Sequence, residues 1–299
     1  MPRVSVIIPT YNCAQFVCQA IDSVLDQTFT DYEIVVVDDG STDDTKSKLE
    51  PYFDKIKYIF QKNKGLACAR NTAIKNSSGE LIALLDSDDL YMPMRLEKSV
   101  KIFDQDSNVG LTHGDAIYIS HTGETLGPFE RDTSHLSGYI WEDLIMRKSL
   151  LICPTITFRK ACLSKSGLFD ENLSKLGAED RDMWIRIAQH FRVYYIPENL
   201  AYYRITPGSM SKDDGKMLQA RLYLIDKYYP PGKGFNFKRR KALNSTFMKM
   251  GDWAYWDGSY RKAYDHYITA IRHYPWGFVT WYHLAKAIVK GFKSKLVVK

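Results

Sequence analysis

Two acidic residues, Asp86 and Asp88, follow an apolar stretch, and their spacing suggests chemistry more strongly than any other feature of the sequence. Carboxylates held so close together repel each other, and a hard divalent cation with oxygen ligands relieves that repulsion. One or two carboxylates together with substrate phosphates are the usual ligands of Mg²⁺, and similarly of Mn²⁺. We therefore interpret Asp86 and Asp88 as a site for Mn²⁺ or Mg²⁺ and a phosphate. Asp89 alone is better explained as a turn or cap residue.

A second acidic pair, Asp38 and Asp39, follows another apolar run. A carboxylate at the end of a strand can accept hydrogen bonds from a ribose or a base, as it does in other nucleotide-binding sheets. The alternative is that the pair caps the next helix. Because Ser41, Thr42 or Asp43 can already provide that cap, the first pair remains available for another role.

Three further charged residues each have two interpretations. Arg70 can pair with a diphosphate or with Asp39, or it can be an ordinary surface charge. Glu179 and Asp180 stand in the first turn of a predicted helix, where the helix dipole favours acidic residues for structural reasons alone. A carboxylate there can also act as a general base that takes the proton from an attacking hydroxyl. The residues themselves leave these alternatives open.

Hydrophobic periodicity predicts the elements that position these residues. Continuous apolar runs indicate buried strands, and apolar residues at helical spacing indicate the helices between them. In the first part of the chain strands are expected at 4–8, 33–37, 56–60 and 81–85, and helices at 16–25 and 66–74. This alternation predicts an α/β fold with a doubly wound, mostly parallel sheet. Ligands bind such sheets beyond the carboxyl ends of the strands, where the acidic clusters stand.

After about residue 110 the pattern is mixed, with strands expected at 151–158 and 192–196 and a helix at 179–189. The segment 229–234 is rich in Pro and Gly and is the best candidate for a linker. Only helical periodicity follows it. We therefore predict two domains, a catalytic domain over 1–230 and a small all-α extension over 235–299.

The helical extension carries the spacing of a tetratricopeptide repeat. Small and aromatic residues take the positions of that pattern: Phe247, Met250, Gly251, Ala254, Gly258, Tyr260, Ala263, Tyr267, Ala270 and Pro275. Trp281, Leu284 and Ala285 restart it. One repeat with a closing helix and a plain helical hairpin explain the pattern equally well.

Composition excludes several classes of protein. Hydrophobic residues make up 45% and charged residues 25%, which is ordinary for a globular protein. No secretory leader and no apolar run of about 20 residues is found, so we expect a cytoplasmic protein. The five cysteines form no CxxC pair and are interpreted as small core residues rather than a zinc site.

The net charge of +6 is unevenly distributed. From Gly232 onward the chain has 14 Lys and Arg against 3 Asp, whereas the preceding part has 27 against 32 acidic residues. An acidic body with a basic tail does not indicate a nucleic-acid binder. In the segment 276–299, aromatic residues precede interleaved lysines and apolar residues, a pattern suited to peripheral binding at the anionic inner face of a membrane. The alternative is a capping helix with a solvated basic face.

Five short motifs occur in an order that resembles family 2 glycosyltransferases of the GT-A fold. They are PTYN at 9–12, DDGSTD at 38–43, ARN at 69–71, DSDD at 86–89 and ED at 179–180. The segment 158–171 also resembles the stretch that precedes ED in that family, and the resemblance covers about residues 3–211. It implies a nucleoside-diphosphate sugar as donor and inversion at the anomeric carbon.

The resemblance also implies roles for individual residues. Pro9 and Tyr11 would line the base pocket, and Asp39 would hydrogen-bond the base, most often uracil. Arg70 would lie beside Asp39. Asp86 would contact the ribose and Asp88 the metal ion. Asp180 would be the catalytic base, supported by Glu179.

Two departures from the family pattern refine this expectation. Thr206 stands where a histidine is common, so a second contact to metal or phosphate is either absent or supplied by Arg204 or Ser209. No QxxRW motif is present, which indicates an enzyme that adds one residue per event rather than a processive synthase. The acceptor, a glycan or a lipid-linked glycan of cell-surface assembly, would bind the loosely patterned segment 111–176.

Two other functions compete with this interpretation. A nucleotidyltransferase of similar fold would need a Gly-rich, basic phosphate loop, and residues 9–16 contain neither Gly nor a basic residue. A non-catalytic sugar-nucleotide-binding or scaffold protein would have no need to keep Asp86, Asp88 and Asp180 together.

Overall fold

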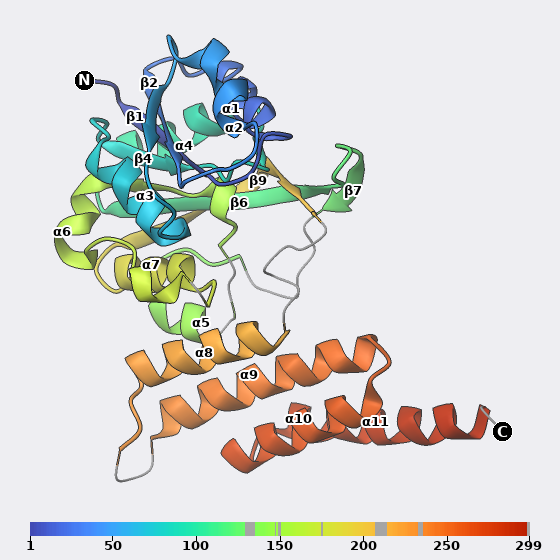
Figure 1. The fold of residues 1–299 in the computed structure, drawn as a ribbon. Coiled ribbons are helices and arrows are strands. Elements are labelled where there is room, and N and C mark those ends of the chain that lie inside the picture. Colours follow the sequence, from blue (N-terminus) through green and yellow to red (C-terminus); the bar gives the residue numbers. More distant parts are fainter. Residues whose placement is uncertain are drawn as a thin grey trace. The chain divides into compact units, whose positions relative to one another are not determined.

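The computed structural model describes residues 1–128, 135–146, 148, 151–174, 176–206, 214–232 and 236–297. The chain forms two compact units (Figure 1). The sheet unit comprises Met1–Leu144 and Ser149–Met210, and the helical unit comprises Ile145–Lys148 and Ser211–Lys299. The division between a catalytic domain at 1–230 and a tail at 235–299 stays a proposal.

The first half of the sheet is parallel. Its strands are β1 (Val4–Thr10), β2 (Tyr32–Asp38), β3 (Lys57–Phe60) and β4 (Leu81–Leu84), in the order β3-β2-β1-β4. Every residue of β1 and β4 is buried, which explains why these strands read as continuous apolar runs.

Helices connect the parallel strands and complete the core. They are α1 (Val17–Leu25), α2 (Thr45–Leu49), the 3₁₀ turn Glu50–Tyr52, α3 (Leu66–Lys75) and α4 (Arg95–Gln105). Alternate residues of β1, Val4, Val6 and Ile8, form one apolar cluster with α1 and α4. The chain leaves each strand at its carboxyl end and returns through a helix, so the loops after β1, β2 and β4 share one edge of the sheet.

The second half of the sheet mixes directions. It contains β5 (Leu90–Tyr91), β6 (Val109–Ile119), β7 (Thr125–Pro128), β8 (Thr157–Arg159) and β9 (Arg192–Arg204). The short β8 is antiparallel to both β4 and β6, whereas β9 runs parallel to β6 and antiparallel to β5. The predicted α/β class and doubly wound sheet are confirmed. The sheet was expected to be mostly parallel, and it is parallel in its first half and mixed in its second.

The strand expected at 151–158 is shorter than predicted. A 3₁₀ turn, Cys153–Thr155, occupies its middle, and β8 begins only at Thr157. Pro154 lies in that turn and has no N–H to give to a ladder, which is why the apolar run does not continue as a strand. The remaining helices of the sheet unit are α5 (Trp141–Ile145), α6 (Leu163–Ser166), α7 (Glu179–Ala188) and the 3₁₀ turns Lys160–Cys162 and Glu171–Leu173.

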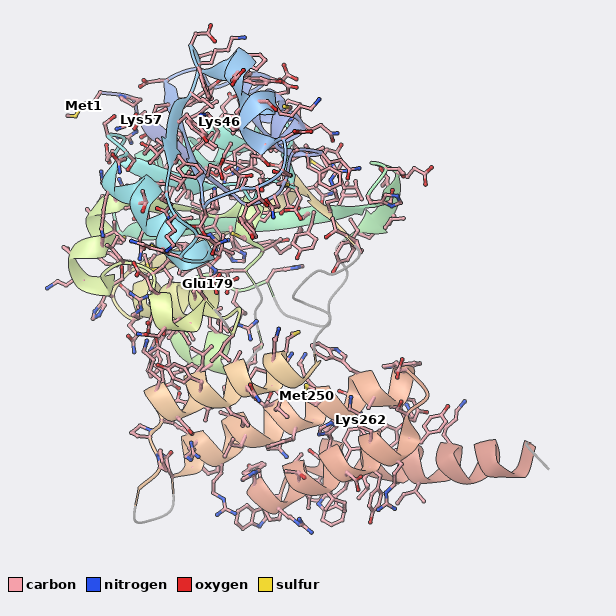
Figure 2. The ribbon with its side chains drawn as sticks, in the orientation of Figure 1. Met1, Lys46, Lys57, Glu179, Met250 and Lys262 are labelled. Atoms are coloured by element: carbon pink, nitrogen blue, oxygen red, sulfur yellow. The ribbon has the colours of Figure 1, made fainter. Side chains whose placement is uncertain are left out.

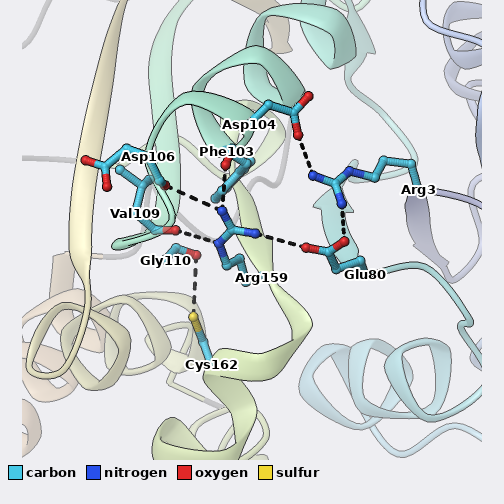
Figure 3. A network of polar contacts seen from close by, with 9 residues as sticks. All are labelled: Arg3, Glu80, Phe103, Asp104, Asp106, Val109, Gly110, Arg159 and Cys162. Atoms are coloured by element: carbon cyan, nitrogen blue, oxygen red, sulfur yellow. Dashed lines mark hydrogen bonds and ion pairs between the residues drawn. The ribbon is translucent and has the colours of Figure 1, made fainter.

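Charged residues gather at the amino ends of β1 and β4, the sheet edge opposite to the acidic motifs (Figure 3). Arg3, just before β1, forms ion pairs with Glu80 and Asp104. Arg159 also pairs with Glu80, at 2.9 Å, and donates to the carbonyls of Phe103 and Val109. This network fastens the loop after α4 to the starts of the strands.

The helical unit consists of α8 (Asp214–Tyr228), α9 (Phe237–Trp256), α10 (Tyr260–His273) and α11 (Phe278–Val297) (Figure 1). α9 and α10 approach closely at Gly251, where an added Cβ would lie 2.5 Å from the Tyr267 ring. Ala254, Ala263 and Leu284 surround that contact. The succession α9, α10, α11 fits both alternatives, a tetratricopeptide-like repeat with a closing helix and a plain helical hairpin. Among the described residues no helix combines the length and apolarity needed to cross a membrane.

Candidate active site

The loop after β1 is fastened to the loop after β2. Asn12 has a positive φ of 47°, a conformation that Asn tolerates better than most residues. Its side-chain oxygen accepts from the Thr42 backbone N–H at 2.8 Å, and its own N–H donates to the Ser41 hydroxyl at 2.9 Å. Pro9 is buried at the end of β1, whereas Tyr11 is 51% exposed. An aromatic ring is therefore accessible directly above the strand ends.

Asp38 and Asp39 are both buried and both accept hydrogen bonds. Asp38 accepts from the Ser41 N–H at 2.8 Å and from the Tyr58 hydroxyl at 3.0 Å, so it shapes its own loop. Asp39 accepts from the Gln61 amide at 2.6 Å.

The backbone N–H groups of Lys64 and Gly65 also donate to the Asp39 carboxylate, at 3.0 and 2.8 Å. A carboxylate has about four acceptor positions, so one remains for a ligand. Gly65 has a φ of +92°, a conformation that L side chains rarely adopt, and the turn there delivers its N–H to Asp39.

Arg70 connects two of the acidic motifs. It is only 2% exposed, so it is not the surface charge that the sequence left open as one alternative. Its Nη2 donates to Asp86 Oδ1 at 2.7 Å, and its Nη1 donates to Glu179 Oε1 at 3.0 Å. Burial disfavours the charged guanidinium, but the carboxylates of Asp86 and Glu179 outweigh this and raise the pKa of Arg70. One side chain thus joins the end of β4 to the start of α7.

The motif after β4 gives its acidic residues different environments. Asp86 is half-buried against Arg70. Burial, and after it the neighbouring Asp86 charge, raise the pKa of Asp88 to about 6. Asp89 is buried and accepts from the Arg204 backbone N–H at 2.8 Å, so its side chain ties the turn to β9 rather than capping a helix.

Arg204, at the end of β9, donates hydrogen bonds to other groups of the protein. Its Nε donates to the Asp88 carbonyl at 2.7 Å, its Nη2 to Gln19 at 2.9 Å and its Nη1 to the Ser120 carbonyl at 3.2 Å. The guanidinium also lies 4.5 Å from the centre of the Phe16 ring. Its role is therefore to hold the loop that carries Asp88. Thr206 is half-buried, and Ser209 lies outside the described residues.

The two acids at the start of α7 differ in burial. Glu179, labelled in Figure 2, is 3% exposed, and its Oε2 has no hydrogen-bond partner. Burial raises the pKa of Glu179 to about 7, Arg70 opposes this shift, and the charge of Asp180 adds to it. Asp180 is half-buried and accepts from the Arg181 backbone N–H at 2.5 Å. Of the pair, Asp180 is the carboxylate that a ligand can reach.

The residues after β4 fit the expected metal ion. Carboxylate oxygens are the hard ligands that Mg²⁺ and Mn²⁺ take. Burial and the neighbouring Asp86 charge both disfavour the ionised form of Asp88, and a cation bound there would offset both effects. Among the described residues no group of three or more His, Cys, Asp or Glu side chains converges on one point. A metal ion held here would use one or two carboxylates, with the remaining ligands supplied from outside the protein.

Two contacts of the site were missed in the sequence. Asn71, the last residue of ARN, accepts from the Phe169 N–H at 2.9 Å and donates to the Phe169 carbonyl at 2.9 Å. The Phe169 ring lies 5.5 Å from the Arg70 guanidinium. Cys153, interpreted only as a core residue, accepts from Arg70 Nη2 at 3.2 Å. The sequence indicated both ARN and the segment 158–171, but only the folded structure shows that they contact each other.

Known proteins resemble this chain in sequence. The model of glycosyl transferase family 2 matches residues 5–149. An uncharacterised glycosyltransferase of Rickettsia typhi is 32% identical over 251 residues, 80% of this chain and 73% of that protein. Chondroitin synthase of Escherichia coli is 32% identical over 195 residues, 63% of this chain but only 27% of the synthase. The chain also spans 37% of an uncharacterised glycosyltransferase of Rickettsia felis.

Solved structures share the fold. S. aureus TarS 1–349, in complex with UDP-GlcNAc, superimposes with a TM-score of 0.64 at 20% identity, covering 91% of this chain and 81% of TarS. A mannosyltransferase of Pyrobaculum calidifontis, in complex with GDP-Man and Mn²⁺, gives a TM-score of 0.59 at 21% identity, covering 98% and 88%. These structures show the fold, and the family model together with the Rickettsia typhi relative shows the family: the chain is a glycosyltransferase and belongs to glycosyltransferase family 2.

Proposed function

We propose that this glycosyltransferase moves a sugar from a UDP-sugar to an acceptor hydroxyl with inversion, in a single step that depends on Mn²⁺ or Mg²⁺. The observation that carries the proposal is the Arg70 guanidinium bonded to both Asp86 and Glu179. It brings the expected donor motif and the expected catalytic motif to one point. Two structures of similar fold also bind nucleotide sugars, UDP-GlcNAc in TarS and GDP-Man with Mn²⁺ in the mannosyltransferase.

The donor half of the proposed site consists of Pro9, Tyr11, Asp39, Asp86 and Asp88. The exposed Tyr11 ring stacks on the base, above the buried Pro9. Asp39 uses its remaining acceptor position for the base. Asp86 bonds the ribose, and Asp88 holds the metal ion, which supplies positive charge to the leaving diphosphate.

The catalytic half centres on Asp180. It takes the proton from the acceptor hydroxyl as the oxygen attacks the anomeric carbon and the bond to the diphosphate breaks. Glu179 does not reach the acceptor in this scheme because its carboxylate is buried against Arg70. Its part is to fix Arg70, and through Arg70 the position of Asp86.

The acceptor and the location of the enzyme are also part of the proposal. We expect the acceptor to be a glycan or a lipid-linked glycan of cell-surface assembly. We expect the enzyme to act at the cytoplasmic side, bound peripherally to an anionic membrane. The support is the excess of Lys and Arg from Gly232 onward. A nucleotidyltransferase is disfavoured by the family match. A non-catalytic binding protein would bind the donor without turning it over.

Isothermal titration of UDP against the full chain, with Mn²⁺ present and then absent, tests the donor site. We expect metal-dependent binding that Asp88→Ala abolishes. Asp180→Asn is the matched control, because it removes one carboxylate of the site without touching the donor half. It should bind UDP as the wild type does and lose about 10²- to 10⁴-fold in turnover of the UDP-sugar.

Two results would contradict the proposal. UDP binding that changes neither with Mn²⁺ nor in Asp88→Ala would contradict the proposed metal site. Equal turnover by wild type and Asp180→Asn would remove Asp180 as the base.

A further inference from the structure

The closing helix α11 has two apolar faces, and the described residues of the helical unit cover only one of them. Thr280, Leu284 and Ala287 are buried, and they recur at the spacing of one helical face. Leu284 and Ala287 join the cluster that α10 and the end of α9 build around Tyr267. This face accounts for the packing of α11 on its own unit.

The second face is exposed and rich in aromatic residues. Its members are exposed and again follow helical spacing, i, i+3, i+4, i+7 and onward: Phe278, Trp281, Tyr282, Ala285, Ile288 and Val289. We call these six residues the aromatic face. Phe278 is 87% exposed, Tyr282 61% and Val289 54%. Such a stripe lies along one side of a helix and normally packs against other apolar residues. The described residues of this unit do not cover it.

Basic residues border the aromatic face. Lys286 and Lys290 are exposed one turn apart, and the Lys286 ammonium lies 5.4 Å from the centre of the Tyr282 ring. The sequence of α11 contains no Asp and no Glu. A surface of large apolar rings, bordered by Lys286 and Lys290, therefore extends along the helix.

The chemistry of this surface favours one kind of partner. The outer helix of a repeat array normally presents a polar face to water, and here that face is apolar. Trp and Tyr rings with flanking lysines are the composition of helices that lie in a lipid headgroup region. Each lysine near an anionic surface adds to the attraction, and no acidic residue of α11 opposes it. Another protein would need a matching acidic and apolar surface.

We propose that the aromatic face of α11 docks on an anionic lipid surface, with the rings among the headgroups and Lys286 and Lys290 on lipid phosphates. The docking rests on the proposed function only for its purpose, which is to bring the enzyme to a lipid-linked acceptor. The binding itself is measurable without donor or acceptor.

Flotation of the full chain with phosphatidylcholine vesicles, with and without phosphatidylglycerol, tests the docking. We expect flotation only with the anionic lipid. Phe278→Ser/Val289→Ser and Lys286→Glu/Lys290→Glu should each weaken it by about tenfold or more, the first by removing inserted apolar area and the second by reversing charge.

Two control variants match these changes elsewhere. Phe60→Ser/Leu126→Ser removes two exposed apolar residues of the sheet unit, and Lys46→Glu/Lys55→Glu, also in the sheet unit, changes the net charge by the same amount. Both should float as the wild type does. UDP titration of every variant reports the donor site separately, so loss of the proposed function and loss of docking are distinguishable.

Three outcomes would overturn the docking. The first is equal flotation with neutral and anionic vesicles. The second is unchanged flotation of Phe278→Ser/Val289→Ser in protein whose circular dichroism matches the wild type. The third is a dimer by light scattering that this variant dissociates, since a second copy would then cover the aromatic face.

Discussion

The sheet unit holds two arginine networks at opposite edges of one sheet, and they differ in exposure to water. At the carboxyl edge Arg70 and Glu179 have side chains that are 2% and 4% exposed. At the amino edge Arg3 is 27% exposed, and its partners Glu80 and Asp104 are 50% and 57% exposed. The same residue types therefore serve two purposes. The amino-edge network fastens loops, whereas the carboxyl-edge network holds charge where water cannot screen it.

This difference predicts how strongly each network resists substitution. A surface ion pair contributes about 0–1 kcal/mol, because water screens the charges and compensates for a lost partner. Removing one partner of a buried pair leaves an uncompensated charge and costs about 3–5 kcal/mol. The carboxyl edge should therefore be the less tolerant of the two, although both contain good hydrogen bonds.

The largest effect is expected for Arg70→Met. It leaves Asp86 and the buried Glu179 without their shared cation, so the free energy of unfolding in urea should fall by about 3–5 kcal/mol. Arg3→Met is the matched control and should lose no more than about 1 kcal/mol. Equal losses in the two variants would mean that burial does not distinguish the networks.

The next effect concerns pH and Glu179. Its pKa is raised from an ordinary 4.5 to about 7 in the folded protein, so the unfolded chain releases this proton first as the pH rises. The stability that results is fully present below about pH 4.5 and is lost as the pH rises through about 7. Glu179→Gln cannot ionise and should lack this fall of roughly 3 kcal/mol in unfolding free energy.

Urea unfolding at several pH values checks this, with Glu80→Gln as the control. Glu80 is half-exposed at the amino edge, so its variant should keep the shape of the wild-type curve. A Glu179→Gln curve that parallels the wild type would show that the buried carboxyl does not titrate in this range.

The smallest effect is expected within the amino-edge network. Arg159 is less exposed than Arg3 and donates to backbone carbonyls, which a lysine cannot reach with the same fork of N–H groups. Arg159→Lys should lower the unfolding free energy by about 1–2 kcal/mol, and Arg3→Lys by less. If Arg3→Lys is the more damaging, the ion pairs rather than the carbonyl contacts hold that edge together.

The sequence predicted the parallel half of the sheet well because β1 and β4 are buried along their whole length and β2 is buried over most of it. The strand at 151–158 was predicted too long, since the apolar run did not reveal the turn that Pro154 imposes. Local patterns also could not decide the role of Arg70. Its partners lie 16 and 109 residues away, so only the folded chain shows that its charge is buried and shared.

The motifs predicted which residues gather at the carboxyl edge. They did not predict which of these side chains form hydrogen bonds with other parts of the protein. Asp39 accepts three hydrogen bonds from the segment 61–65, and Arg204 donates to the loop that carries Asp88. Both are charged residues beside the site, and spacing alone does not separate a ligand contact from an internal one. The distinction comes from hydrogen-bond partners far away in sequence.

The position of Arg204 has a mechanical consequence. It ends β9, and the sheet unit itself ends only six residues later, at Met210. The chain also passes between the units at Ile145 and at Lys148, so only the part of a pulling force that is carried by the crossing at Met210 would enter the sheet unit through β9. The Arg204 guanidinium is tied to Gln19 and to the carbonyls of Asp88 and Ser120, so the load would spread over three separate parts of the chain. These contacts of Arg204 would resist displacement of the loop that carries Asp88 when β9 is pulled.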